Sequence, residues 1–334
     1  MNNWINQCHF GDCIETMRRM PDGFVQTCVT SPPYFGLRDY GHDGQIGLEP
    51  TPDQFIAKLV DVFREVKRVL KDDGTLWLNI GDSYAAQRGG SHQPAETLAG
   101  GQGGKMENGA TVNRDRHAGY NPTRNASAIG VKHKDLIGIP WLLAFALRAD
   151  GWYLRQEIIW HKPNPMPESV TDRCTKSHES IFLLAKSEKY YFDNGAIAEQ
   201  IAQSTANDSR LTREGYETVR PDRGFPGSAS HGNGLLVPKG DPTKRNKRSV
   251  WTVATTPYKG AHFATFPPAL IEPCILAGAP TGGIVLDPFG GSGTTAQVAQ
   301  SLGRKWILCE LNEAYKPLIE DRTMQPSFEF AEAA

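Results

Sequence analysis

The stretch Thr30-Ser31-Pro32-Pro33-Tyr34 ends the apolar run Phe24-Val25-Gln26-Thr27-Cys28-Val29. The run is typical of a buried strand, and the two prolines must end its hydrogen-bond ladder because proline has no N–H and fixes its own φ. The chain is therefore expected to turn a rigid corner here. Such a corner holds the Ser31 hydroxyl, the Pro32 carbonyl and the Tyr34 ring close together.

These three groups are suited to gripping a planar amine. The exocyclic amine of a nucleobase is a poor nucleophile, because its lone pair is delocalised into the ring. Two acceptors that draw its protons out of the ring plane, the Ser31 hydroxyl and the Pro32 carbonyl, would free the lone pair, and the Tyr34 ring offers a face for stacking. The alternative is an ordinary turn at a strand end, since turns rich in Ser and Pro are common.

A second informative stretch lies near the end of the chain. The pattern predicts a strand, a glycine-rich loop, a helix and another strand over residues 283–286, 287–293, 294–302 and 305–309. Glu310 ends the last strand, 19 residues after Gly291. This arrangement is typical of a nucleoside-binding βαβ unit, in which glycines allow close backbone approach and the acidic side chain accepts both ribose hydroxyls.

The loop itself, Asp287-Pro288-Phe289-Gly290-Gly291-Ser292-Gly293, departs from the usual dinucleotide pattern. A carboxylate and an aromatic ring precede three closely spaced glycines. No Gly-Lys-Ser/Thr ending is present, which disfavours a triphosphate site. The loop fits a cofactor with a ribose and a charged amino-acid tail, and the alternative is a plain helix-entry turn.

The rest of the chain alternates strands and helices. Asp12 follows a short strand, where α/β sheets bind ligands, and it is also placed to cap the next helix. Thr51, Pro52 and Gln54 begin a long amphipathic helix that Gly74 is expected to end. Further helices are predicted over 13–20, 136–148 and 267–277, and further strands over 7–10, 75–80, 153–160 and 179–185. No helix separates the last two strands, so we expect them to be antiparallel.

The 334-residue chain has a net charge of −1, which hides two basic segments. Residues 85–134 contain seven Lys and Arg against three Asp and Glu, and residues 201–260 contain ten against five. Two interpretations are open: basic insertions that touch phosphates, or plain solvated loops. The densest run, Lys244-Arg245-Asn246-Lys247-Arg248, lies close to Trp251.

Nothing in the pattern indicates a membrane or secreted protein. No apolar run approaches the roughly 20 residues that a membrane helix needs, and the first residues do not form a signal-peptide pattern. The six cysteines form no C-x-x-C pair, so we expect reduced, mostly buried thiols. A cytoplasmic location is the expectation.

With both motifs in view, the chain resembles the S-adenosylmethionine-dependent DNA amino-methyltransferases of the permuted β group, which act on cytosine N4 or adenine N6. In this group the Ser/Asp/Asn-Pro-Pro-Tyr motif comes first and the Gly-rich cofactor motif comes late, as here. The resemblance covers nearly the whole chain apart from the two basic insertions. It implies an α/β fold with a seven-stranded, mostly parallel sheet and one reversed strand, the Rossmann-like class I methyltransferase fold.

The resemblance also implies roles for individual residues. The catalytic residues that hold the target base would be Ser31, Pro32, Pro33 and Tyr34. The residues that contact S-adenosylmethionine would be Asp12, Phe263, Phe266, Pro267, Asp287, Phe289, Gly291, Gly293, Thr294 and Glu310. The DNA contacts expected from the basic run are Lys244, Arg245, Lys247 and Arg248. Trp160 is a candidate stacking partner for the base, and a core role is its alternative.

The implied organisation is a permuted catalytic domain over 1–194 and 263–325, with a basic loop insertion at 85–134. A target recognition region would occupy 195–262, and residues 326–334 would form a tail. The expected partner is double-stranded DNA, and a homodimer and a cognate restriction endonuclease stay open. No metal is expected, because the sulfonium methyl is already activated and the enzyme must mainly align amine, methyl and sulfur.

The first motif position bears on the choice of base. The family's cytosine-N4 enzymes usually carry Ser there, and its adenine-N6 enzymes usually carry Asp or Asn, so Ser31 favours cytosine N4. Adenine N6 is the alternative, because Ser is a weaker acceptor than Asp but still an acceptor. A non-catalytic DNA-binding regulator and an RNA methyltransferase are the remaining hypotheses.

Overall fold

The structure is a computed structural model that describes residues 3–37, 42, 44–85, 126–200, 244–255 and 266–324. The chain divides into two compact units, one formed by Met1–Phe192 with Ser249–Ala334 and the other by Asp193–Arg248. Most of both predicted insertions, the cofactor candidate Phe263 and the C-terminal tail lie outside the described residues.

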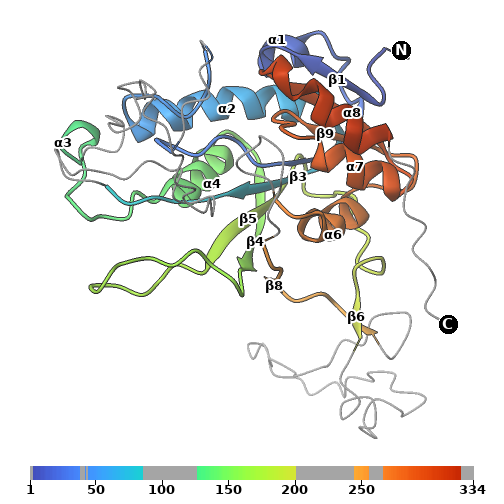
Figure 1. Cartoon of the computed structure of the whole chain (residues 1–334). Helices are drawn as coiled ribbons and strands as arrows, with labels where there is room; N and C mark the ends of the chain where they lie inside the picture. The colour runs from blue at the N-terminus through green and yellow to red at the C-terminus, as the bar shows by residue number, and fades with distance from the viewer. Residues whose placement is uncertain are drawn as a thin grey trace, which may run out of the picture. The chain divides into compact units, whose positions relative to one another are not determined.

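The larger unit is built on one sheet in the order β1-β10-β9-β2-β3-β5-β4-β8 (Figure 1). β5 is antiparallel to both of its neighbours, and all other neighbouring strands are parallel. β5 is therefore the single reversed strand. The strands are β1 (Gln7–Phe10), β2 (Val25–Thr30), β3 (Leu70–Ile80), β4 (Tyr153–His161), β5 (His178–Ala185), β8 (Val250–Thr252), β9 (Ile284–Asp287) and β10 (Lys305–Glu310).

The predicted fold class is confirmed, with eight strands rather than seven. The additional strand, β8, pairs with β4, so that Trp251 lies opposite Trp160. Trp251 is buried. A three-residue strand has no readable period, which is why the sequence pattern did not separate it from the insertion. The expected antiparallel pairing of β4 with β5 is confirmed.

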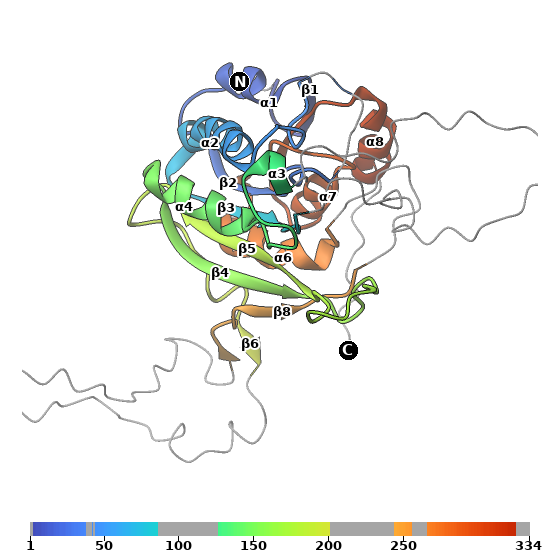
Figure 2. The ribbon, with the colours of Figure 1, turned by 90° about the vertical axis from the view of Figure 1, so that its left-hand side faces the viewer.

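The helices of this unit form two groups, which Figures 1 and 2 show on opposite sides of the sheet. Right-handed crossovers explain this, because the chain adds strands in one direction after β9 and in the other direction after β2. One group is α1 (Cys13–Arg18), α2 (Pro52–Val69) and α4 (Ile139–Ala149), and the other is α6 (Pro268–Gly278), α7 (Thr294–Ser301) and α8 (Lys316–Met324). The described ranges of this unit also contain two short helices, α3 (Ala126–Ile129) and η3 (Glu313–Tyr315).

Helix α2 begins as predicted and ends earlier. The Thr51 hydroxyl accepts from the Gln54 amide at 3.3 Å. β3 starts immediately after the helix, at Leu70, so Gly74 lies inside this strand and the prediction that it ends the helix was wrong. A Cβ atom at Gly74 would lie 2.9 Å from the Lys71 carbonyl oxygen and 3.1 Å from that of Gln26. The glycine therefore permits close strand packing.

Helix α4 begins at Ile139 and not at the predicted residue 136. The cause is Asp82, whose carboxylate accepts from the amides of Gly138 at 3.0 Å and Ile139 at 3.1 Å. Gly138 has a left-handed backbone, which no helical residue can have. A cap 56 residues away in sequence cannot be read from local pattern.

All six cysteines are free, and four of them are buried. The prediction of reduced, mostly buried thiols is confirmed. Burial also raises the pKa of the Cys13 thiol to about 12, so this thiol stays protonated. None of the helices in the described ranges is long and apolar enough to cross a lipid bilayer.

β2 and β9 are neighbours in the middle of the sheet, with Cys28 opposite Leu286. From this pair the chain winds outward in both directions, which makes it the topological switch point of the sheet. In open α/β sheets, ligands bind beyond the carboxyl ends of the strands at such a point. The two motifs predicted to carry chemistry follow these two strands.

Candidate active site

The two motif loops are joined directly at the switch point. Thr30, the last residue of β2, donates from its hydroxyl to Asp287 Oδ1 at 2.6 Å. Asp287 is the last residue of β9, 257 positions further along the chain. The structure therefore brings the Ser31 corner and the glycine-rich loop to the same edge of the sheet.

The carboxylate of Asp287 is fully occupied by protein donors. Besides Thr30, it accepts from the Thr295 hydroxyl at 2.6 Å and from the Phe289 amide at 3.0 Å. Its side chain is 2% exposed, and burial raises the pKa of this carboxyl above its ordinary value although the three hydrogen bonds oppose the shift. Asp287 thus fixes the shape of the loop that follows it.

The glycine-rich loop packs tightly on the neighbouring elements. Gly290 donates its amide to the Cys309 carbonyl at 2.8 Å, on the adjacent strand β10. Gly293, at the start of α7, has a φ of +86°, and a Cβ there would lie 3.2 Å from Ile319 Cα. Both the backbone conformation and the space favour glycine at this position. Thr294 turns its buried hydroxyl toward α8 and accepts from Arg322 at 2.7 Å.

Glu310 contacts the glycine-rich loop from the end of β10. Its Oε2 accepts from the Gly291 amide at 2.7 Å, and its Oε1 accepts from the Asn312 amide at 2.9 Å. Burial raises the pKa of Glu310, and the hydrogen bonds from the two amides oppose this rise. The side chain joins the end of β10 to the loop after β9.

The same edge carries features that suit a nucleoside with a polar tail. The Ser292 hydroxyl is buried within the glycine-rich loop and has no hydrogen-bond partner among the described residues. Phe289, in the same loop, is partly buried against the hydrophobic core. Glu310 at the end of β10, with the unsatisfied Ser292 hydroxyl and the Phe289 ring of the loop that it contacts, fits a ribose, a polar tail and an adenine.

Two further cofactor candidates lie at element ends. Asp12 caps α1, accepting from the Glu15 amide at 2.9 Å, and the neighbouring Gly11 donates its amide to the Glu310 carbonyl at 2.9 Å. The capping role is thus present, and Asp12 lies next to the strand that carries Glu310. Pro267 is buried at the start of α6, directly after the half-buried Phe266.

The Ser31 corner follows β2 without regular structure. Ser31 is half-buried, and its hydroxyl makes no hydrogen bond with any residue in the described ranges. Pro32 is buried. Tyr34 donates from its hydroxyl to Glu179 Oε2 at 2.8 Å. The corner therefore presents one hydroxyl that no described residue engages and one tyrosine that is anchored.

Sequence reasoning missed the partners of Tyr34. Glu179 lies at the start of the reversed strand β5, and its Oε1 accepts from Lys162 Nζ at 2.5 Å. Asn79, near the end of β3, donates to Glu179 Oε2 at 3.3 Å. The available signal was polar residues at the ends of otherwise apolar strands, which converge at one edge of the sheet.

Trp160 has the core role that was its alternative. It is 3% exposed, its Nε1 donates to the Val253 carbonyl at 2.8 Å, and Lys162 Nζ lies 4.2 Å from its ring centroid. Its ring face is therefore already covered by an ammonium group.

In the smaller unit, β6 (Glu199–Gln200) pairs with β7 (Lys244–Arg245). Glu199 lies within 4 Å of the side chains of Arg245, Lys247 and Arg248, at 3.5, 3.7 and 3.2 Å. Burial acts to raise the pKa of Glu199, but Arg248 and Lys247 outweigh it and hold this pKa below its usual value. One acid thus gathers three of the four predicted DNA contacts.

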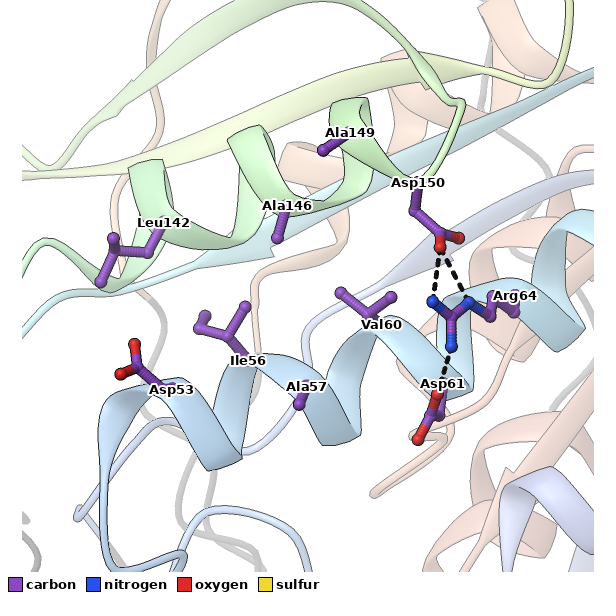
Figure 3. A pocket seen from close by; sticks show the side chains of 10 residues that line it. All are labelled: Asp53, Ile56, Ala57, Val60, Asp61, Arg64, Leu142, Ala146, Ala149 and Asp150. Carbon is purple, nitrogen blue, oxygen red and sulfur yellow. Dashed lines mark hydrogen bonds and ion pairs between the residues drawn. The ribbon is translucent and has the colours of Figure 1, made fainter.

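A surface groove lies between α2 and α4, lined by apolar side chains, with Asp53 toward one end and Asp61, Arg64 and Asp150 toward the other (Figure 3). Arg64 donates to Asp150 at 2.8 Å and to Asp61 at 2.7 Å, so these charges are paired with each other. The groove is lined by residues of α2 and α4 and by Asp150, and the loops that follow β2 and β9 do not contribute to it. It is therefore a separate feature from the switch-point site. In the part of the chain with described coordinates, no group of three or more His, Cys, Asp or Glu could hold a metal ion.

Comparison with known proteins agrees with this geometry. The family model for N6/N4 DNA methylases, described as DNA methylase, matches residues 25–321. The chain is 45% identical over 312 residues to Type II methyltransferase M.Cfr9I of Citrobacter freundii, covering 93% of this chain and 85% of that protein. It is 45% identical over 315 residues to M.SmaI of Serratia marcescens, covering 94% and 89%.

Two solved structures share the fold. PvuII DNA methyltransferase (cytosine-N4-specific) superposes with a TM-score of 0.59 at 16% identity, covering 96% of this chain and 86% of that one. A putative DNA modification methylase from Thermus thermophilus, in complex with S-adenosyl-L-methionine, has a TM-score of 0.54 at 21% identity and covers 97% and 95%. Since the family model spans most of the sequence and two relatives match nearly all of it, this chain belongs to the N6/N4 DNA methylases, the S-adenosylmethionine-dependent DNA amino-methyltransferases.

Proposed function

We propose that the chain is a site-specific DNA methyltransferase that moves a methyl group from S-adenosylmethionine to the N4 amine of a flipped cytosine in duplex DNA. The observation that carries this proposal is the hydrogen bond of Thr30 with Asp287, which joins the amine-gripping corner to the glycine-rich loop. One motif could bind a base and the other a nucleoside cofactor, and transfer requires both at one edge.

On the cofactor side, the bound group supplies a methyl already activated on a sulfonium. Glu310 would accept hydrogen bonds from the ribose hydroxyls. Gly291, whose amide donates to Glu310, has no side chain and would let the cofactor approach the loop backbone closely. Phe289, Asp12 and the segment before α6 would enclose the adenine and the amino-acid tail. Asp287 would hold the shape of the loop, because its carboxylate accepts hydrogen bonds from Thr30, Phe289 and Thr295.

On the base side, the Ser31 hydroxyl and the Pro32 carbonyl would accept the two amine protons, and Tyr34 would stack on the ring. The amine is paired inside a duplex, so the base must leave the stack at a cost of a few kcal/mol. Alignment of amine, methyl and sulfur then supplies most of the rate enhancement. A residue that holds the base or the loop should affect the rate strongly.

Ser31 supports cytosine as the target. The PvuII enzyme, which shares the fold, is named cytosine-N4-specific, in agreement with this choice. Mass spectrometry of DNA from cells expressing the chain tests it: N4-methylcytosine is expected, and N6-methyladenine alone would reject the base assignment. Calorimetric binding of S-adenosylmethionine without any methyl transfer would instead favour the non-catalytic regulator.

The similarity to Type II methyltransferases supports a restriction–modification role. A cognate endonuclease and a homodimer stay predictions. Duplex DNA is the proposed substrate, and competition of unlabelled duplex RNA against labelled DNA distinguishes the two nucleic acids.

Glu310→Gln is expected to weaken S-adenosylmethionine binding and to remove its pH dependence at acidic pH. The pKa of Glu310 is raised above its ordinary 4.5, and only the ionised form accepts from both ribose hydroxyls. The affinity of the wild type should therefore fall as pH drops through this raised pKa, measured by calorimetry. A wild-type affinity that stays constant through this titration would contradict the role.

The effect of pH on folding stability is opposite to its effect on cofactor affinity. A carboxyl whose pKa is raised in the folded state favours folding most at low pH, and this contribution is lost as pH rises through the raised pKa. Glu310→Gln removes this cost of ionisation but keeps only one acceptor oxygen for the Gly291 and Asn312 amides, so its free energy of unfolding near pH 7 should stay within about 1–2 kcal/mol of the wild type, measured by urea unfolding. A weaker affinity in a stable variant separates ligand binding from loss of fold.

Replacing the four basic residues Lys244, Arg245, Lys247 and Arg248 with alanine is expected to weaken DNA binding and flatten its salt dependence. Each lost phosphate contact should reduce the slope of log K against log salt by about 0.9. Binding of a duplex at several salt concentrations measures this. Glu199→Gln is the matched control in the same cluster, and it should not weaken binding because it removes the acid that contacts three of them. An unchanged slope would mean that the run is merely solvated.

A further inference from the structure

Tyr34 has a hydroxyl that stacking alone does not need. A phenylalanine would offer the same ring face, yet the Tyr34 hydroxyl donates to Glu179 Oε2 at 2.8 Å and lies 3.4 Å from Asn79 Oδ1. Asn79 Nδ2 lies 3.3 Å from the same Glu179 oxygen. The phenol is therefore tied to a carboxylate on a strand 145 residues away.

The ring of Tyr34 is also limited from the side of β3. A Cβ atom at Gly81 would lie 2.5 Å from Tyr34 Cε2 and 3.0 Å from Cδ2, distances at which something must move. The ring therefore rests directly on the backbone that follows β3. Glu179 holds the hydroxyl and Gly81 supports the ring edge, which together restrict both rotation and tilt.

Glu179 is itself held in place. Lys162 Nζ donates to Glu179 Oε1 at 2.5 Å and covers the ring of the buried Trp160 at 4.2 Å. The side chains of Lys162 and Glu179 are only 19% and 16% exposed. The Glu179 carboxylate is thus paired with the largely buried Lys162 ammonium, and the Trp160 ring in turn holds this ammonium in place.

These contacts form a continuous chain along one edge of the sheet. It runs from Trp160 through Lys162 and Glu179 to Tyr34, so it links β4, β5 and the corner after β2. The cofactor candidates Gly291 and Glu310 lie on the loop after β9 and on β10, and they are not part of these contacts of Trp160, Lys162, Glu179 and Tyr34. A substitution in this series of contacts should therefore change how the base is held without changing cofactor binding.

We propose that Glu179 is a positioning residue for the methyl transfer, which orients the Tyr34 ring for the flipped base through the phenol hydroxyl, with Lys162 as its counter-ion. The inference rests on the proposed function. Glu179 does not touch the base, and its effect passes through Tyr34. Because rate depends steeply on the placement of the reacting groups, a loosened ring should lower kcat and leave cofactor affinity unchanged.

A double-mutant cycle tests this. The variants are Glu179→Ala, Tyr34→Phe and the two together, assayed by single-turnover transfer of labelled methyl to plasmid DNA from a host without the enzyme. Each single change is expected to lower the rate about tenfold, and the double change also about tenfold. Independent effects would multiply to about a hundredfold and would overturn the proposal. Glu179→Gln keeps an acceptor oxygen for the phenol and should recover most of the rate.

Tyr190→Phe is the matched control. It removes a phenol hydroxyl that accepts from Arg155 at 3.2 Å, outside the Tyr34 contacts. Its rate is expected to stay within about twofold of the wild type. Calorimetry should give the same S-adenosylmethionine affinity for all variants, and a loss of cofactor affinity in Glu179→Gln would contradict the proposal.

A second readout does not need activity. In full-length protein with ¹³Cζ-labelled tyrosine, the Tyr34 signal is the one absent from Tyr34→Phe. Glu179→Gln and Glu179→Ala should shift this signal, because it reports on the phenol hydrogen bond. An unchanged Tyr34 signal would overturn the proposed contact of Glu179 with Tyr34, whether or not the wild type transfers methyl to DNA. Absence of methyl transfer by the wild type, with a shifted Tyr34 signal in the variants, would instead reject the proposed function.

Discussion

Replacing Tyr34 with alanine is expected to lower the rate of methyl transfer to DNA by about 100-fold or more. The variant would lose the proposed stacking face for the flipped base, and it also loses the hydrogen bond of the phenol hydroxyl with Glu179. Base–aromatic stacking is worth about 1–3 kcal/mol, and misplacement of the amine adds to that loss. Transfer of labelled methyl from S-adenosylmethionine to duplex DNA measures the rate.

The affinity for S-adenosylmethionine should change only modestly in Tyr34→Ala, because the cofactor candidates lie on the loop after β9 and on β10. Tyr153→Ala is the matched control, since Tyr153 is 44% exposed at the amino end of β4. Its rate should match that of the wild type. A near-normal rate in Tyr34→Ala would remove Tyr34 from the base pocket.

Asp287→Ala is expected to lower the free energy of unfolding by about 2–4 kcal/mol and to abolish tight cofactor binding. The change leaves the hydroxyls of Thr30 and Thr295 and the Phe289 amide without their acceptor in a buried place. The cost of burying the carboxylate, which raises its pKa, disappears in the variant and keeps the loss below the sum of three hydrogen bonds. Urea unfolding measures the stability.

The matched control for Asp287 is Asp61→Ala. The Asp61 carboxylate pairs with Arg64 on the surface of α2, with both side chains 58% exposed, and such exposed pairs contribute little to stability. Asp287→Asn keeps one acceptor oxygen and should fall between the wild type and Asp287→Ala. If Asp287→Ala were as stable as Asp61→Ala, the link between the two motif loops would not stabilise the fold.

Local pattern predicted the elements that carry the two motifs. An apolar run that ends in two prolines predicts a strand followed by a corner, and β2 with the Ser31 corner has this form. The spacing from Gly291 to Glu310 was enough to place the acidic side chain against the loop. In each case the rule depends on neighbours within about 20 residues, which sequence shows directly.

Elements whose limits depend on distant residues were predicted less well. Gly74 has the composition of a helix end, yet the backbone of Gln26 on the neighbouring strand requires a glycine within β3. The start of α4 is set by Asp82, and β8 exists because β4 offers it an edge. These are contacts across the fold, which outweigh local propensity.

Sequence by itself determined the main strands and helices that carry the two motifs, the family and the motifs themselves, because each of these depends on side chains close together in the chain. Tertiary structure alone decided that Thr30 meets Asp287 and that Glu179 holds Tyr34, over separations of 257 and 145 residues. Such pairs form only when parallel strands place their carboxyl ends side by side and a reversed strand brings its start to the same edge. The neighbour of each side chain is then set by strand order, which residue types within one segment do not encode.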